Sequence, residues 1–137
     1  MKIFVDTGAW VALYDGNDRY HKKAMRIWNQ LKSEVPLLFT SNLVIAETIT
    51  LLRRSSGFAH SARFGDAIFG SVLVKRIYFP ESLEGLAWRI FKKYHDQDFS
   101  FTDCTSFAIM SDGGIPKAFT FDHHFDVFGF ERPAQAD

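Results

Sequence analysis

Four acidic residues spread along the chain stand where carboxylates could act together on one ion: Asp6, Glu47, Asp103 and Asp122. Two of them, Asp6 and Asp122, directly follow short apolar runs at 2–5 and 118–121 that are typical of buried strands. Carboxylate oxygens are ligands that Mg²⁺ and Mn²⁺ prefer in proteins. If the fold brings the four side chains to one place, they could bind such an ion.

The elements expected around these acids would bring them to one edge of a sheet. Strands that alternate with helices are parallel, so Asp6 and Asp122 should share the carboxyl edge, where α/β proteins bind ligands. Glu47 and Asp103 lie early in expected helices at 43–55 and 102–111, and both should face that edge. Four like charges in one cleft raise one another's pKa values unless a divalent cation neutralises them.

Glu47 is the acid with the strongest reason to bind a cation. On the helix expected at 43–55, it shares a face with Val44, Thr48 and Leu51 by the spacing of three and four residues. Its carboxylate would therefore lie in an otherwise apolar stripe. Burying an unpaired carboxylate is costly, so we expect Glu47 to be buried beside a cation.

The rest of the chain alternates strands and helices. Strands are expected at 2–5, 37–40, within 72–79, at 118–121 and, as a short fifth strand, at 127–130. Helices are expected at 7–14, 21–31, 43–55, 59–71, 83–94 and 102–111. This order predicts an α/β fold, with a central parallel sheet of four to five strands between helices in an α/β/α sandwich. We expect a single domain over 1–132 and a loose tail at 133–137.

Composition narrows the function classes. With 16 basic and 16 acidic residues, the formal net charge of zero argues against a passive nucleic-acid coat, which needs an excess of cations. It does not argue against a nuclease, whose metal site is itself acidic. The 15 Phe among 137 residues are many for this length, and we expect some of them to meet a partner or a second copy.

The chain carries one cysteine, Cys104, which excludes an internal disulfide and a cysteine-based zinc site. Only one Lys and three apolar residues stand between Met1 and Asp6, which is too short for a signal peptide. No apolar run approaches the length of a membrane span. We therefore expect a cytoplasmic protein without a membrane partner.

Each aspartate of the acidic set also has a structural explanation. Asp6, Asp103 and Asp122 could be helix N-caps or acids of a first helical turn, where a negative charge is stabilised by the helix dipole. That explanation suits each residue taken alone. It does not suit Glu47, which lies beyond the first turn among apolar neighbours.

The ordered motifs around the acids resemble those of PIN-domain ribonucleases, and most closely the VapC-type toxins of prokaryotic toxin–antitoxin pairs. The resemblance spans nearly the whole chain, and its motifs are Val5-Asp6-Thr7, Ala46-Glu47-Thr48, Phe101-Thr102-Asp103-Cys104-Thr105, Thr120-Phe121-Asp122-His123-His124-Phe125 and Gly129-Phe130. It implies a PIN-like fold and a metal-dependent endoribonuclease that uses Mg²⁺ or Mn²⁺. It also implies an RNA substrate, a cognate antitoxin and a homodimer.

The same resemblance assigns roles to individual residues. It makes Asp6 and Asp103 the leading metal ligands, with Glu47 and Asp122 completing the site, some of them through water. The hydroxyls of Thr7, Thr102 and Thr120 would hold these ligands in place. Asp126 is a doubtful fifth acid, and the pattern assigns no role to His123 or His124.

The chemistry of such a site follows from the ion. A carboxylate-bound metal lowers the pKa of a bound water and shields the phosphate charge, so water can be the nucleophile. The expected products then carry 5′-phosphate and 3′-hydroxyl ends. Basic side chains outside the acidic set would hold the RNA backbone, and Arg53, Arg54 and Arg63 are the candidates, although solvated surface charge explains each equally well.

Four other interpretations compete with this one. Asp6-Thr7-Gly8-Ala9 matches the catalytic triplet of aspartic proteases, but it leads into a helical pattern. A metal-free ribonuclease could use His95, His123 or His124 as acid and base. Cys104 could be a nucleophile, although a small residue inside a helix is more often core. Finally, the chain could be a catalytically silent PIN-like module that acts only through protein partners.

Overall fold

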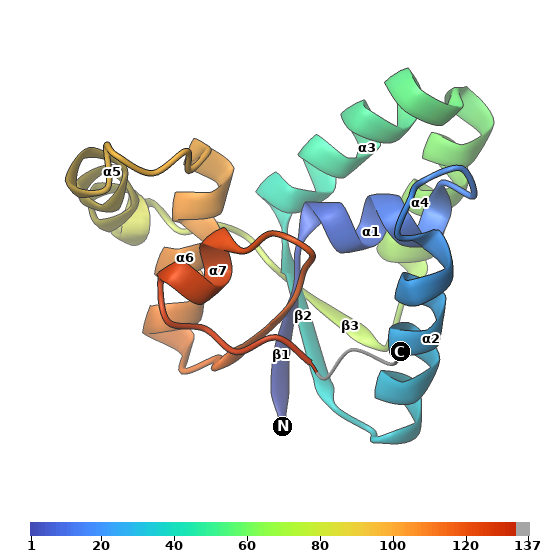
Figure 1. The fold of residues 1–137 in the computed structure, drawn as a ribbon, viewed down its shortest axis with the longest axis horizontal. Helices are drawn as coiled ribbons and strands as arrows, with labels where there is room; N and C mark the ends of the chain where they lie inside the picture. Colours follow the sequence, from blue (N-terminus) through green and yellow to red (C-terminus); the bar gives the residue numbers. More distant parts are fainter. Residues whose placement is uncertain (134–137) are drawn as a thin grey trace.

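A four-stranded, all-parallel sheet runs through the middle of the computed structural model, which describes residues 1–133 (Figure 1). Its strands are β1 (Lys2–Val5), β2 (Leu37–Ser41), β3 (Val74–Ile77) and β4 (Lys117–Phe119), in the order β3-β2-β1-β4. In the centre of the sheet, Phe4 lies between Phe39 of β2 and Ala118 of β4. The chain therefore reverses its strand order beside β1, where open α/β sheets bind ligands.

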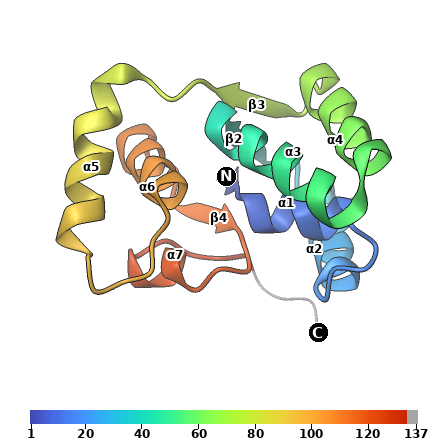
Figure 2. The same cartoon turned by 90° about the horizontal axis from the view of Figure 1, so that it is seen from above.

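Helices cover both faces of the sheet (Figures 1 and 2). One side carries α1 (Thr7–Tyr14), α2 (His21–Ser33), α3 (Asn42–Ser56) and α4 (Phe58–Gly70). The other side carries the short 3₁₀ helix η1 (Glu81–Leu83), α5 (Glu84–Lys93), α6 (Phe101–Gly113) and α7 (His124–Val127). The predicted α/β/α sandwich is confirmed.

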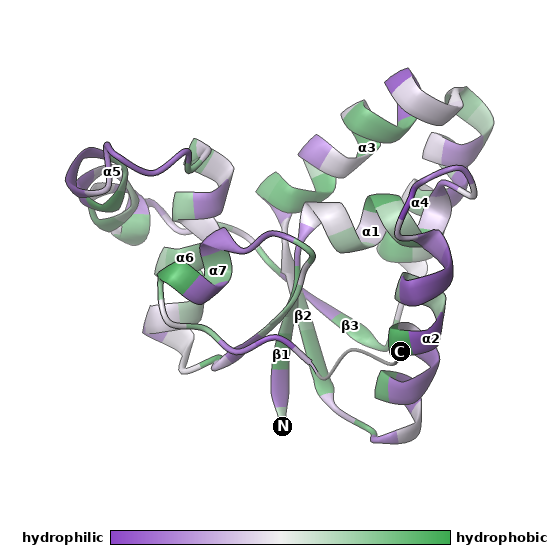
Figure 3. Cartoon of the chain, in the orientation of Figure 1, coloured by the Kyte–Doolittle hydropathy of each residue, from purple (hydrophilic) through white to green (hydrophobic). Residues whose placement is uncertain are grey.

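The core lies where the strands meet these two layers. Ile3, Phe4 and Val5 of β1 are fully buried, because a central parallel strand is covered on both faces. Figure 3 shows the middle of the sheet as hydrophobic, while much of α2, at the outside of the molecule, is hydrophilic. This amphipathic pattern matches the helix spacing that places Ala24, Ile27 and Leu31 inward.

A cluster of aromatic rings supports the side of the sheet that carries α6. Phe107, fully buried in the middle of α6, stacks on Phe128 with ring centroids 4.7 Å apart. It also meets Phe99 and Phe125 edge to face, at 5.0 and 4.9 Å. Such edge-to-face and offset contacts add to the hydrophobic stabilisation of the buried rings.

The prediction of a fifth strand at 127–130 is wrong. Val127 ends helix α7, and the next aromatic residues, Phe128 and Phe130, turn toward Phe107 instead of pairing in the sheet. Within residues 1–133, this segment reaches the sheet only through an isolated bridge between Lys117 and Glu131. The apolar run after a turn predicts a strand, but packing of its rings on Phe107 fixes its position instead.

One other expectation needs correction. Strand β4 ends at Phe119, so Asp122 follows it after a short connection, not directly. On the outer side of α5, Phe91 is 38 % exposed and stacks on Trp88 with centroids 5.5 Å apart. Of the tail expected at 133–137, residues 134–137 lie outside the described part of the chain. Among the described residues, no helix is both long and apolar enough to cross a membrane.

Candidate metal centre

The four acidic residues singled out in the sequence line one open cleft of about 1000 Å³ at the carboxyl edge of the sheet. Its walls come from the start of α1, one face of α3, the start of α6 and the connection after β4. The acids that line it are Asp6, Asp18, Glu47, Asp103 and Asp122. The structure thus brings together residues that are more than a hundred positions apart in the sequence.

Asp6 lies deepest in this cleft. It follows β1, its backbone N–H donates to the carbonyl of Phe119 (3.0 Å), and only 5 % of the residue is exposed. Although Asp6 holds the N-cap position of α1, its side chain makes no capping bond and instead accepts a hydrogen bond from Thr120 Oγ1 (3.0 Å). Burial, and then the charge of Asp103, raise the pKa of Asp6 to about 7. A structural role as a helix cap therefore does not explain this residue.

Thr120 joins Asp6 to the next acid. Its hydroxyl donates to Asp6 and accepts the backbone N–H of Asp122 (3.0 Å). Asp122 in turn accepts the backbone N–H of His124 at Oδ1 (3.0 Å), which closes a tight turn before α7. The charge of Asp122 also contributes to the raised pKa of Asp6, so the two carboxylates interact across this hydroxyl.

Asp103 both caps helix α6 and belongs to the acidic cluster of the cleft. Ser100 Oγ accepts the backbone N–H of Asp103 (3.0 Å), and Asp103 Oδ2 accepts the backbone N–H of Ser100 (2.9 Å). This reciprocal capping box fixes the start of α6. The pKa of Asp103 is nevertheless raised, first by burial and then by the charges of Asp122 and Glu47, against the hydrogen bonds from Ser100.

Glu47 is less buried than we expected. It lies half-buried on the face of α3 that forms a wall of the cleft, and its neighbour on that face, Leu51, is 40 % exposed. The helix spacing placed Glu47 on the correct side of α3, beside the buried Val44 and Thr48. The face opens into the cleft after its first turn, so the apolar stripe does not close over the carboxylate.

Two of the three predicted threonines lie against Asp6. Thr120 binds it directly, and Thr7 is the next residue, buried with an Oγ1 that has no hydrogen-bond partner within residues 1–133. Thr102 lines the cleft beside Asp103. An unsatisfied buried hydroxyl next to a crowded, buried carboxylate is costly for the protein alone. A hard divalent cation would offset both costs, so the residues present fit such an ion.

The chain is similar to known proteins over nearly its whole length. The model of the PIN domain matches residues 3–131, which is nearly the whole chain. This chain belongs to the PIN domain family. The family that the sequence motifs indicated is thereby confirmed.

Relatives place this PIN domain among VapC-type toxins. It is 40 % identical over 128 residues to the "23S rRNA-specific endonuclease VapC20" of Mycobacterium tuberculosis, with 93 % of this chain and 95 % of the relative covered. It is also 25 % identical over 129 residues to the "VapC ribonuclease" of Archaeoglobus fulgidus, covering 93 % of this chain and 81 % of the relative. The prediction of a VapC-like ribonuclease is confirmed at this level.

Solved structures agree with this placement. The crystal structure of M. tuberculosis VapC20, described as a sarcin–ricin loop cleaving toxin, matches with a TM-score of 0.86 and 38 % identity, covering 93 % of this chain and 95 % of that one. VapBC2 from Rickettsia felis, bound to a promoter DNA fragment, matches with a TM-score of 0.73 and 14 % identity, covering 99 % and 100 %. The second match concerns the fold alone.

The three candidate arginines of the PIN domain lie in different places. Arg54 lines the acidic cleft. Arg53, its neighbour on α3, lies over the ring of Phe58 at 5.2 Å. Arg63 lines a separate pocket of about 260 Å³ between α1, α2 and α4. Of the three, only Arg54 lines the cleft that the acids share.

Other residues of the site were not singled out in the sequence. Asp18 and Tyr20, from the turn between α1 and α2, line the cleft, and Tyr20 stacks on Phe121 with centroids 4.5 Å apart. Nothing in the local sequence indicates that this turn folds over the cleft. Arg54 could have been preferred, because it lies seven residues, or two helical turns, after Glu47. The doubtful fifth acid, Asp126, forms a bidentate ion pair with Arg132 (2.7 and 2.9 Å).

The structure weakens three of the competing interpretations. The triplet that resembles an aspartic protease opens helix α1 at the edge of a parallel sheet, which is not the all-β setting of those enzymes. Cys104 is fully buried, and burial followed by the charge of Asp103 raises the pKa of its thiol to about 11, so the thiolate is disfavoured. None of the five histidines lines the acidic cleft of the described chain, which disfavours histidine acid–base catalysis there.

Proposed function

We propose that this protein is a metal-dependent endoribonuclease that hydrolyses RNA with Mg²⁺ or Mn²⁺ held by Asp6, Asp103, Glu47 and Asp122. The observation that carries the proposal is the buried carboxylate of Asp6, whose pKa is raised to about 7 inside a cleft shared with the other acids. Such crowding is unfavourable for stability and is typical of functional sites. A divalent cation would offset the electrostatic cost of the crowded carboxylates, and the bound ion would serve RNA hydrolysis.

Some residues of the site would bind the ion, and others would orient these ligands. Asp6 and Asp103 come from β1 and α6 and would be the principal ligands, while Glu47 and Asp122 complete the site from the two other walls. Thr120 holds Asp6 and Asp122 in register through its hydroxyl, and Thr7 offers an unsatisfied oxygen beside them. Thr102 would support Asp103. When bound, the ion supplies a water of lowered pKa and shields the charge of the phosphate.

Arg54 lies on the same face of α3 as Glu47 and would hold the RNA backbone while the acids act on the scissile phosphate. Arg53 and Arg63 would contribute at most to the positive electrostatic potential of the surface. The identity to VapC20 makes 23S ribosomal RNA the first substrate to test. The products would carry 5′-phosphate and 3′-hydroxyl ends, because water is the nucleophile.

We also propose a cognate antitoxin and a homodimer as partners. Structural neighbours include FitAcB from Neisseria gonorrhoeae, with a TM-score of 0.67 and 15 % identity, and VapBC2, which support the fold of such toxins. Large apolar side chains that are exposed in the single chain, such as Phe58, Tyr78 and Trp88, support protein partners of this kind. An RNA substrate and an antitoxin fit the expected cytoplasmic location.

A cleavage assay with antitoxin-free protein tests the enzymatic proposal. Ribosomes and total RNA would be incubated with the protein, with chelator, and with chelator followed by excess Mg²⁺ or Mn²⁺, and the cut ends would be sequenced. We expect cleavage that the chelator abolishes and the metal restores, with 5′-phosphate ends, and none from Asp6→Asn protein. Cleavage by Asp6→Ala protein at the wild-type rate would instead identify a silent binding module with a contaminating nuclease.

A further inference from the structure

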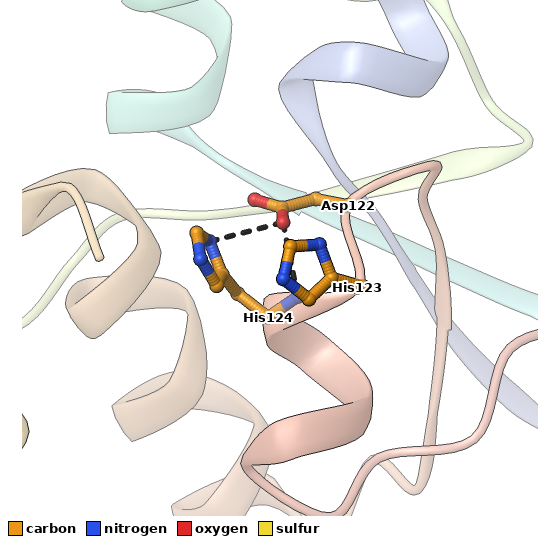
Figure 4. Close-up of side chains that lie close together, drawn as sticks. All are labelled: Asp122, His123 and His124. Atoms are coloured by element: carbon orange, nitrogen blue, oxygen red, sulfur yellow. Dashed lines mark hydrogen bonds and ion pairs between the residues drawn. The ribbon is translucent and has the colours of Figure 1, made fainter. Parts of the chain in front are cut away.

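Asp122, which lines the acidic cleft, and the two residues that follow it bring nitrogen and oxygen donors close together; we call this place the rim (Figure 4). One ligand atom each from Asp122, His123 and His124 lies within 4.8 Å of the other two. His124 Nδ1 is 3.0 Å from Asp122 Oδ1. We propose that these three residues form a second metal site, which takes a transition-metal ion such as Zn²⁺ in preference to Mg²⁺.

The donor set decides which ion the rim site would take. Two imidazoles and one carboxylate suit Zn²⁺ and its neighbours in the first transition row, whereas Mg²⁺ binds oxygen ligands. The acidic cleft itself offers a cation carboxylate and hydroxyl oxygens, among them those of Asp6, Asp103, Glu47 and Thr7. The two places therefore differ in chemical preference even though both include Asp122.

The local geometry is close to that of a metal site. Two ligands bound at about 2.0–2.2 Å on neighbouring corners of a zinc tetrahedron lie about 3.3–3.5 Å apart. The 3.0 Å between His124 Nδ1 and Asp122 Oδ1 is near this spacing, so an ion would replace their hydrogen bond with little movement. The backbone N–H of His124 also donates to Asp122 Oδ1 (3.0 Å), which holds the carboxylate at the turn.

The two imidazoles differ in how firmly they are held. The ring of His124 packs edge to face against Phe99 at 5.1 Å and is mostly shielded from solvent. His123 is exposed, with its ring 4.5 Å from that of His124. Exposed side chains change rotamer rapidly, so His123 can turn its nitrogen toward the ion at small cost. The site consists of a fixed pair and one adjustable ligand.

A shared carboxylate couples the rim to the proposed nuclease centre. This consequence rests on the proposed function, because it matters only if Asp122 serves Mg²⁺ in the cleft. An ion at the rim would bind Asp122 Oδ1 and so reduce the negative charge that this carboxylate can offer to an ion in the cleft. Zn²⁺ would then inhibit Mg²⁺-dependent cleavage, but its binding at the rim does not depend on that activity.

The test measures binding, not cleavage. Full-length, tag-free, metal-stripped protein would be titrated with Zn²⁺ by calorimetry and with Co²⁺ by visible absorption, for wild type, His123→Ala and His124→Ala. In wild type we expect the tightest Zn²⁺ site to take one ion per chain. In both variants we expect at least about tenfold weaker binding at this site, with loss of the Co²⁺–imidazole absorption. His95→Ala, which removes an exposed histidine of α5's C-terminal flank, is the matched control and should bind as wild type.

Further arms separate this proposal from the previous one. Asp6→Asn should keep Zn²⁺ binding at the rim, while its loss of Mg²⁺-dependent cleavage reports on the nuclease proposal alone. Unchanged Zn²⁺ affinity in His123→Ala protein, or a loss confined to Asp6→Asn, would put the ion elsewhere and overturn the rim site. Thermal unfolding of each variant checks the fold, and His123→Ala decides the outcome if His124→Ala is unstable, because His123 is exposed.

Discussion

The first turn and the middle of the same helix, α6, are built on opposite physical principles. Its first turn carries Asp103 into a cleft where neighbouring carboxylates raise one another's pKa values. Its middle carries Phe107, which is fully buried among the rings of Phe99, Phe125 and Phe128. The first turn therefore brings unfavourable charge together, whereas the middle of the helix gains favourable packing.

This contrast shows how a marginally stable domain can hold a site that is costly by itself. Crowded carboxylates without a cation reduce stability, as the pKa of Asp6 near 7 indicates. The aromatic cluster, one turn further along α6, supplies packing that keeps the cleft in place. Substitutions at the cleft should therefore change activity with little loss of stability, and substitutions in the cluster should do the reverse.

The largest effect is expected from Asp103→Asn. The amide oxygen can still accept the backbone N–H of Ser100, so the capping box survives while the negative charge is lost. We expect RNA cleavage to fall by about 10³- to 10⁴-fold, which corresponds to roughly 4–5 kcal/mol of transition-state stabilisation. Single-turnover cleavage at saturating Mg²⁺ measures it.

Ser100→Ala is the matched control for that variant. It removes the hydroxyl that accepts the backbone N–H of Asp103 and leaves every acid in place. The expected cost is about 1 kcal/mol of unfolding free energy, with cleavage within a few-fold of wild type. Equal losses of cleavage in the two variants would mean that Asp103 acts only as a cap.

Phe107→Ala should have the opposite profile. Removing a fully buried ring that contacts at least three others creates a cavity, and such changes cost about 3–5 kcal/mol. Urea unfolding should show this loss, while Mn²⁺ affinity of the folded fraction stays near the wild-type value. A selective loss of metal binding at full stability would contradict the division of roles along α6.

The comparison also separates what the sequence could predict from what it could not. Parallel topology follows from alternating strands and helices, and it brings Asp6, Asp103 and Asp122 to one edge. Helix spacing places Glu47 on the face of α3 that meets this edge. These parts of the site were predictable because they depend on regular geometry that local patterns determine.

The remaining parts depend on contacts between distant segments. The turn that carries Asp18 and Tyr20 reaches the cleft through its packing on Phe121, which no local pattern indicates. Phe128 and Phe130 resemble a strand in sequence but pack on Phe107. A run of aromatic residues has two ways to be buried, pairing in a sheet or packing of rings, and only the tertiary structure decides between them.

The pH dependence of stability tests the cost of the cleft. In metal-free protein the pKa of Asp6 is about 7 when folded and 3.8 as the ordinary value, so the folded state binds the extra proton between these values. Stability should therefore fall as pH rises from about 4 to about 7. Asp6→Asn removes this penalty and should stabilise metal-free protein by roughly 2–4 kcal/mol at pH 8 and by much less at pH 4.

Chemical denaturation at the two pH values, with chelator present, measures this difference. Saturating Mg²⁺ should reverse the ranking at pH 8, because the wild type gains binding energy that the variant lacks. If Asp6→Asn protein is less stable than wild type at pH 8 without metal, the ionised carboxylate of Asp6 does not destabilise the folded protein.

Thr120→Val should lower both the stability of the protein and its affinity for metal, each to a smaller extent than the variants above. The substitution keeps the shape but removes the hydroxyl that joins Asp6 Oδ2 to the backbone N–H of Asp122. We expect a loss of roughly 1–2 kcal/mol in stability and about tenfold weaker Mn²⁺ binding by calorimetry. Thr48→Val, which removes a buried hydroxyl that donates to the carbonyl of Val44, should lower stability alone.

The smallest effect is expected from Arg54→Ala, on the affinity for RNA. This effect should depend on where the arginine lies more than on its charge. Arg53 and Arg54 are adjacent and exposed, but Arg54 lines the acidic cleft and Arg53 lies over Phe58. With chelator present to prevent cleavage, Arg54→Ala should weaken RNA binding about three- to fivefold and reduce the slope of affinity against salt by about one. Arg53→Ala removes the same charge from the same helix and should change neither. Equal losses of RNA affinity in both variants would mean that the two arginines act only through the positive electrostatic potential of α3. Arg54 would then make no specific contact with the RNA backbone.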